Sequence, residues 1–285
     1  MILRIMTDLS LNSTQTLQNE VKIPILGLGT WQASGEKLRS AIIEALNLGY
    51  RHIDTAEFYK NEKEVGDAIA SSDVPREEIF VTTKLWYSNH GNKKALKACN
   101  ESLKRMNLDY VDLYLIHWPK PIKRVETWKA LETLYEEGLA KSIGVSNYMV
   151  PHLQEVLDNC KITPMVNQIE FHPFIYSERK AIEEFCTQNN IAIEAYSPLV
   201  RAEKFGHSLI QRLADKYQKS YSQILLRWGL QHDAITIPKS TTPKHIKENS
   251  EIFDFSINEK DMNQMDNIQE YHRVTTWNPL SKEWF

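Results

Sequence analysis

The sequence predicts an α/β protein, a single (β/α)8 barrel of the TIM type with a small β-hairpin at its N-terminal side. Short apolar runs alternate with segments of helical spacing about eight times along 285 residues, the number and length expected of such a barrel. No stretch rich in Pro, Gly or Ser interrupts this alternation, so we expect one domain over residues 17–285. Residues 1–16 lack a hydrophobic pattern and are predicted to form a flexible arm.

The first half of the chain shows the alternation of predicted strands and helices. Residues 18–31 predict the hairpin, which leads into a buried strand at residues 25–29 (ILGLG). Apolar residues three or four positions apart then predict a helix, which Gly49 ends. Further strands are predicted at residues 52–54, 79–83 and 111–116, and helices at 36–48, 62–70 and 93–106.

The second half continues the pattern without a linker. Strands are predicted at residues 142–145, 165–166, 191–195 and 234–237, and helices at 150–157, 178–188, 208–217, 222–230 and from 243 onward.

Composition excludes several classes of function. A net charge of −3 gives no attraction for nucleic acid or an anionic membrane. Cys99, Cys160 and Cys186 are odd in number and widely spaced, which fits neither a disulfide framework nor a zinc module, so we expect no metal. No apolar run approaches the length of a membrane span. We therefore expect a cytoplasmic protein that acts on a small molecule.

Polar residues gather where the predicted strands end. Function in such a barrel collects at the C-terminal ends of the strands. The residues at or just past these ends are Asp54, Lys84, His117, Asn147, Gln168, Tyr196 and Lys239. Because side chains alternate along a strand, Leu113, Leu115 and His117 share one face, and His117 points inward if the leucines fill the barrel.

Four residues near these ends suggest a reaction. Asp54, Tyr59, Lys84 and His117 supply a carboxylate, a phenol, an ammonium group and an imidazole. Lys84 beside the phenol is expected to lower the tyrosine pKa towards the working pH, Asp54 to keep Lys84 charged, and His117 to bind a substrate oxygen. The set suits protonation of the oxyanion formed when a cofactor hydride attacks a carbonyl.

Each of the four also has a plainer explanation. Tyr59 could cover the surface, Asp54 could cap a helix, Lys84 could be a solvated charge and His117 a packed core histidine.

The usual dinucleotide fingerprint is missing. Gln32 stands where GxGxxG requires its third glycine after Gly27 and Gly29, which excludes a Rossmann site. The end of the last strand offers another anion site, because Lys239 and Ser240 precede a predicted helix N-terminus.

The chain resembles the aldo-keto reductase family. Three segments look like the family signatures, and four shorter ones agree with it, over about residues 21–279. The signatures are GYRHIDTAEFYKNEKEVG (residues 49–66), LYLIHWP (113–119) and IPKSTTPKHIKEN (237–249), and the shorter matches are GLGTW (27–31), IGVSNY (143–148), VNQIEFHP (166–173) and AYSPL (195–199).

This resemblance implies an NADPH-dependent reduction of aldehydes and ketones by a monomeric barrel, with NADH as the alternative cofactor. It implies that Tyr59 is the general acid, that Lys84 and Asp54 tune it, and that His117 orients the carbonyl. It further implies that Tyr196 stacks on the nicotinamide. The remaining implied roles are these: Ser146, Asn147 and Gln168 hold the carboxamide, Lys239 and Ser240 meet the 2′-phosphate, and Glu248 and Asn249 lie around the adenine.

The complete implied sets are larger. The cofactor set is Gly29, Thr30, Trp31, Asp54, Ser146, Asn147, Gln168, Tyr196, Ser197, Leu199, Pro238, Lys239, Ser240, Thr241, His245, Glu248 and Asn249. The substrate set is Trp31, Tyr59, Trp86, His117 and Trp118.

Two features of this chain modify the expectation. His245 stands where the family usually has an arginine against the 2′-phosphate, so we expect a weaker preference for NADPH over NADH, and a stronger one in mild acid. The segment of residues 120–125 is short and basic. The positive charges of Lys120, Lys123 and Arg124 favour polar or acidic carbonyl substrates. Substrate choice also depends on a C-terminal segment whose path the sequence does not predict, around Trp277, Asn278, Pro279, Trp284 and Phe285.

Two other functions stay open at this point. The chain could be a non-catalytic nucleotide-binding subunit, although such a subunit has no need of the tyrosine group. It could also act as an alcohol or sugar dehydrogenase, with Tyr59 as the base. A barrel hydrolase is excluded because the strand ends carry neither paired glutamates nor a metal-ligand cluster.

Overall fold

The barrel is closed in the computed structural model, which describes residues 9–280. Strands β3 to β10 form a parallel sheet in chain order, and bridges from Leu26 to Thr236 and from Gly29 to Lys239 join the first strand to the last. The predicted fold class is confirmed. The strands are β3 (Leu28–Gly29), β4 (His52–Asp54), β5 (Phe80–Leu85), β6 (Leu113–Ile116), β7 (Ile143–Ser146), β8 (Val166–Glu170), β9 (Ala192–Tyr196) and β10 (Ile235–Thr236).

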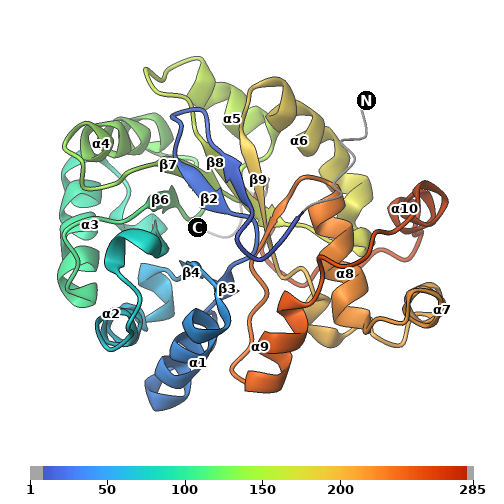
Figure 1. Cartoon of the computed structure of the whole chain (residues 1–285). Helices are drawn as coiled ribbons and strands as arrows, with labels where there is room; N and C mark the ends of the chain where they lie inside the picture. Colours follow the sequence, from blue (N-terminus) through green and yellow to red (C-terminus); the bar gives the residue numbers. More distant parts are fainter. Residues whose placement is uncertain (1–8, 281–285) are drawn as a thin grey trace.

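Helices form a ring around these strands (Figure 1). They are α1 (Gly35–Leu48), α2 (Glu62–Ala70), α3 (Asn92–Met106), α4 (Arg124–Glu136), α5 (Val150–Leu157), α6 (Tyr176–Gln188), α7 (Ser208–Tyr217), α8 (Tyr221–Gln231), α9 (Pro243–Ser250) and α10 (Glu259–Asp266). Short 3-10 helices lie in the connections: η1 (Glu57–Tyr59), η2 (Arg76–Glu78), η3 (Tyr87–Asn89), η4 (Pro173–Ile175) and η5 (Val200–Ala202).

The N-terminal hairpin differs from its prediction. Its strands are β1 (Thr14–Thr16) and β2 (Lys22–Pro24), so the predicted arm over residues 1–16 is wrong at its end. Residues 18–21, expected inside the hairpin, form its turn instead: the Leu17 N–H donates to the Val21 carbonyl oxygen at 2.8 Å, and Glu20 takes a positive φ of 66°. Residues 1–8 of the predicted arm lie outside the described residues.

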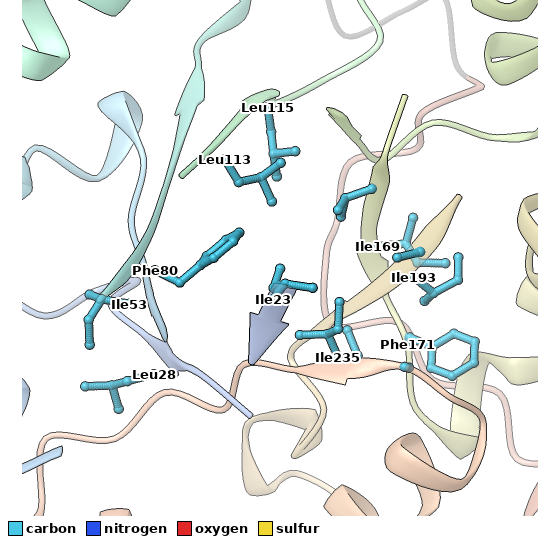
Figure 2. Packing of buried hydrophobic residues seen from close by; sticks show 14 of the residues in the cluster. Ile23, Leu28, Ile53, Phe80, Leu113, Leu115, Ile169, Phe171, Ile193 and Ile235 are labelled. Carbon is cyan, nitrogen blue, oxygen red and sulfur yellow. The ribbon is translucent and has the colours of Figure 1, made fainter. Parts of the chain in front are cut away.

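The hairpin covers the N-terminal end of the barrel. Gln18 Nε2 donates at 3.0 Å to the Thr163 carbonyl oxygen, and Asn19 Nδ2 at 2.9 Å to that of Lys141, just before two barrel strands. Ile23 of β2 is fully buried, and Figure 2 shows it between Phe80 and Ile235 in the core. This end is therefore packed, and function is left to the opposite end.

Two helices were not predicted. In α4, Trp128, Leu131 and Leu134 are buried at helical spacing, so the sequence carried a signal that the prediction did not use. In α10 only Asp261 and Met265 are buried, so no apolar stripe marks it.

Candidate active site

A buried ion pair forms the centre of the site. Lys84 at the end of β5 donates from Nζ to both carboxylate oxygens of Asp54, at 2.7 Å each, and to the Thr55 carbonyl oxygen at 2.8 Å. Lys84 and Asp54 are almost completely buried. The two residues lie on neighbouring parallel strands, β4 and β5, so the register brings their ends together.

Tyr59 lies beside this pair on η1. Its hydroxyl oxygen is 3.4 Å from Lys84 Nζ, and Lys60, with a φ of 59°, ends the turn that carries it. Burial and the Asp54 charge raise the pKa of Tyr59 well above its usual value of 10. The expected lowering of this pKa does not dominate, because burial comes first and the charges of Asp54 and Glu194 add to it.

His117 faces the tyrosine. The two rings are 5.7 Å apart and nearly perpendicular. Burial and the Lys84 charge hold the pKa of His117 well below 6.5, so its imidazole is neutral at physiological pH. A neutral imidazole still donates one N–H hydrogen bond, and its buried Nδ1 has no partner among the residues that the structure describes.

A second group of predicted residues forms one hydrogen-bonded network. Ser146 Oγ donates to the Gln168 carbonyl oxygen at 2.9 Å. Asn147 Nδ2 donates to Ser146 Oγ and to the His117 carbonyl oxygen, at 3.0 Å each, and the Tyr196 hydroxyl donates to Asn147 Oδ1 at 2.7 Å. Strands β7, β8 and β9 thus present two amides and an aromatic ring next to the ion pair.

The end of the barrel's last strand suits a phosphate group. Lys239 is exposed, and Ser240 Oγ accepts from the Thr242 N–H at 3.1 Å, just before α9 begins. An exposed ammonium group, a hydroxyl and a helix N-terminus fit an anion. His245 is exposed in the first turn of α9, and Asn249 is buried at its end.

The other predicted cofactor residues are spread around the same end of the barrel. Thr30 Oγ1 donates to the Asp54 carbonyl oxygen at 2.9 Å, and Ser197 takes a positive φ of 49° directly after β9. Gly29 ends β3, and Glu248 is half-buried in α9. Leu199, Pro238 and Thr241 lie in the loops that follow β9 and β10.

An aromatic wall stands over the tyrosine. Phe58 stacks on Trp86, with ring centroids 3.9 Å apart, and on Trp31 at 5.5 Å. Trp277 from the C-terminal segment lies 5.6 Å from Trp86 and 5.4 Å from Trp118. The structure thus brings the predicted Trp31 and Trp86 together through Phe58, which the sequence did not single out, and joins Trp118 to Trp86 through Trp277. Trp284 and Phe285 lie outside the described residues.

The basic segment contributes less than the sequence suggested. Arg124 pairs with Glu155 and donates to the Pro119 carbonyl oxygen, so its charge is already engaged. Lys123 Nζ is 3.7 Å from Glu126. Lys120 Nζ is 5.7 Å from the ring centroid of Tyr87, and that ring lies 4.6 Å from Trp86 of the wall.

One buried carboxyl group beside the site was not predicted. Glu194 on β9 is completely buried, and its Oε2 accepts from Gln168 Nε2 at 2.9 Å. A signal was available: it is the only acidic residue of the strand AIEAY, two positions before Tyr196 and therefore on the same face.

No metal site or membrane span is evident in residues 9–280. No group of three or more His, Cys, Asp or Glu side chains there is arranged to hold a metal ion. No helix in the same range is long and apolar enough to cross a bilayer.

Known proteins resemble this chain in both sequence and fold. A model described as "Aldo/keto reductase family" matches residues 25–202 and 206–270. The chain is 48% identical over 263 residues to a 9,11-endoperoxide prostaglandin H2 reductase of Trypanosoma cruzi, covering 91% of this chain and 92% of the relative. It is 44% identical over 266 residues to a glyoxal reductase of Bacillus subtilis, covering 93% and 96%.

Solved structures agree. An aldo-keto reductase from a deep-sea metagenome library of the Medee basin superposes with a TM-score of 0.89 at 44% identity, covering 93% of this chain and 98% of the other. A Bombyx mori aldo-keto reductase in complex with NADP superposes with a TM-score of 0.86 at 37% identity, covering 94% and 96%.

Proposed function

Because the chain belongs to the aldo/keto reductase family, we propose that it reduces aldehydes and ketones to alcohols with NADPH, and that Tyr59 is the general acid. The observation that supports this most is the contact of the Tyr59 hydroxyl with Lys84 Nζ at 3.4 Å, beside the buried Asp54. A phenol next to a lysine is a proton donor whose conjugate base can be stabilised.

The proton movements follow from the residues. NADPH, when bound, supplies a hydride to the carbonyl carbon. Tyr59 gives its phenolic proton to the carbonyl oxygen, so that hydride and proton together complete the alcohol. The tyrosine is left as a phenolate, which Lys84 stabilises by donating a hydrogen bond until a solvent proton replaces the one transferred. The raised pKa of Tyr59 keeps the acid form present throughout the physiological range.

His117 positions the carbonyl in this proposal. Its neutral ring donates one hydrogen bond, which favours the carbonyl oxygen as negative charge develops there. Because its charged form is disfavoured by burial and by Lys84, it does not compete with Tyr59 as the proton source.

The remaining predicted sites support a dinucleotide. We propose that Ser146, Asn147 and Gln168 hold the carboxamide and that Tyr196 stacks on the nicotinamide, since the four already form one network. We propose the end of β10, with Lys239 and Ser240, for the 2′-phosphate. The NADP-bound silk-moth relative supports this cofactor class.

Small dicarbonyls are the substrate class that we propose. The relative from Bacillus subtilis is a glyoxal reductase. Lys120 lies over the ring of Tyr87, which contacts Trp86 of the aromatic wall, and a cation there suits a substrate with a polar second group. We further propose a monomer in the cytoplasm, where the unpaired Cys99, Cys160 and Cys186 would stay reduced.

Turnover with a substrate panel tests the proposal. Loss of NADPH absorbance is followed with glyoxal, an aliphatic aldehyde and an aromatic aldehyde, and each assay is repeated with NADH. We expect reduction with NADPH, fastest with the dicarbonyl. Binding of NADPH without reduction of any carbonyl would instead favour a nucleotide-binding subunit, and turnover only in the alcohol-oxidising direction would favour a dehydrogenase.

A further inference from the structure

Glu194 is buried one hydrogen-bonded side chain away from the Asp54–Lys84 pair. A single amide nitrogen joins the two carboxyl groups: Gln168 Nε2 is 2.8 Å from Asp54 Oδ2 and 2.9 Å from Glu194 Oε2. The other glutamate oxygen, Oε1, is 3.4 Å from His52 Nε2, and that nitrogen is 3.0 Å from Thr82 Oγ1. A polar chain therefore runs from Tyr59 down into the barrel, with Glu194 at its centre.

The cation that acts on Glu194 is Lys84, but this lysine is paired with Asp54. The groups that face it are Asp54 and His52 from β4, Lys84 from β5 and Gln168 from β8, with Tyr59 beyond Lys84. Lys84 is bound through two contacts to Asp54. Burial holds the pKa of His52 at about 3, so this ring is neutral.

A neutral carboxyl group fits this environment better than a carboxylate. Oε1 of Glu194 accepts no hydrogen bond from any residue that the structure describes, and a buried carboxylate oxygen without a donor is costly. Burial first, and then the Asp54 charge, raise the pKa of Glu194 to about 8. Glu194 is therefore protonated at neutral pH and ionises in mildly alkaline solution.

We propose that Glu194 is a positioning residue of this site: it fixes the Gln168 amide against Asp54, and its ionisation in alkaline solution holds Tyr59 in the protonated form. The proposal rests on the proposed function of Tyr59 and adds a second ionisable group to it. Two ionisations in one buried cluster oppose each other, because each negative charge makes the next one harder to form. The Glu194 charge is among those that raise the pKa of Tyr59, after burial and Asp54.

Exchange of the glutamate for glutamine separates charge from shape. In Glu194→Gln the side-chain carbonyl still accepts from Gln168 Nε2, but the group no longer ionises. Tyr59 should then lose its proton at a lower pH. Reduction, which needs the phenol, should decline at a lower pH than in the wild type, and alcohol oxidation, which needs the phenolate, should rise at a lower pH.

The first test uses NMR titration of the protein without turnover. With carbon-13 in the glutamate carboxyl groups, one wild-type resonance should titrate near pH 8 and be missing in Glu194→Gln. With carbon-13 in the tyrosine rings, the Tyr59 resonance, assigned with Tyr59→Phe, should begin to titrate at a lower pH in Glu194→Gln than in the wild type. Glu132→Gln is the control, because that buried carboxyl on α4 accepts from the Lys161 and Ile162 N–H groups, away from the site. Coincident Tyr59 titrations in wild type and Glu194→Gln would overturn the proposal.

The second test uses kinetics and binding. The pH profile of kcat/KM for reduction should shift to lower pH by the same amount in Glu194→Gln and not in Glu132→Gln. The affinity for NADPH should stay at the wild-type value in Glu194→Gln and fall several-fold in Glu194→Leu, which leaves one Gln168 N–H without its partner. If Glu194→Leu does not fold, the glutamine variant alone decides. A wild type that reduces no carbonyl would contradict the proposed function, while the NMR titration would still decide the role of Glu194.

Discussion

We propose that His245 faces the 2′-phosphate of the cofactor and so sets the preference for NADPH over NADH. The residue is exposed at the start of α9. An arginine here would present a permanent charge and a planar pair of donors to the phosphate, which a histidine does not. The ratio of NADPH to NADH affinity should therefore rise about five-fold in His245→Arg, as expected of a contact worth ~1 kcal/mol. Fluorescence titration with both nucleotides measures it, and a ratio that is unchanged in His245→Arg would contradict the assignment.

His232 provides a pH-dependent contribution to stability far from the site. Its Nδ1 is 2.9 Å from Glu183 Oε1 and its Nε2 is 3.0 Å from Asp266 Oδ1. Burial alone would lower the pKa of His232, but the two carboxylates outweigh burial and raise it to about 9. The stabilisation is complete below about pH 6.5, where the unfolded chain is also protonated, and is lost as the pH rises through 9.

Urea unfolding of His232→Gln tests this contribution. The free energy of unfolding should fall by about 3 kcal/mol at pH 6 and by much less at pH 10. His272→Gln is the control, because its partner Glu203 is half exposed and such surface pairs contribute little. Equal losses at both pH values in His232→Gln would show that the histidine charge does not stabilise the fold.

At this scale the sequence predicts positions better than it predicts electrostatics. Asp54, Lys84 and His117 were recognisable because each ends an apolar strand. The direction of the Tyr59 pKa shift was not, since it depends on how completely the phenol is buried and on the Asp54 and Glu194 charges around it. Glu194 escaped prediction because it lies inside a strand, where an isolated carboxyl group has no visible partner in the sequence.

Among the elements, α2 and α3 pack so closely that their contact requires a glycine. A Cβ atom at Gly66 would lie 2.0 Å from the carbonyl oxygen of Met106, which belongs to the backbone and cannot move aside. Gly66→Ala should therefore lower the free energy of unfolding by about 3 kcal/mol, the upper range for overpacking. Gly206→Ala is the matched control, because a Cβ there meets nothing within 4 Å. Urea midpoints that fall equally in both variants would contradict the role of this contact.

Helices and strands were predictable where burial imposes a period. Strand β4 and helices α2, α5 and α7 begin and end where the hydrophobic pattern predicted. The pattern failed for α10, which buries few apolar residues, and for the hairpin, whose register is set by the turn around Glu20 rather than by burial.

For the whole molecule, the hairpin supplies part of the core. Ile23 is completely buried at the N-terminal end of the barrel, among side chains from strands on opposite sides (Figure 2). Ile23→Ala should lower the free energy of unfolding by about 3 kcal/mol. Ile122→Ala, at a side chain that is 67% exposed, should change it by no more than about 0.5 kcal/mol. A hairpin that only rests on the surface would give two variants of equal stability.

Barrel closure cannot be predicted from any single segment of the sequence. The repeat of strands and helices predicted the number of units, but the pairing of Leu26 with Thr236 joins residues from the two ends of the chain. That pairing places Lys239 next to Gly29 and so brings the proposed phosphate site to the same end of the barrel as Asp54.

The measurement that tests the central claim most directly is reduction of glyoxal by NADPH in Tyr59→Phe, beside the wild type and Tyr114→Phe. The control removes the same hydroxyl from a buried tyrosine whose oxygen has no partner among the described residues, so it should keep the wild-type rate. With NADPH affinity unchanged, kcat should fall by about 100-fold or more in Tyr59→Phe, the loss expected of an essential general acid. A wild-type kcat in Tyr59→Phe would contradict the assignment of Tyr59 as the proton donor.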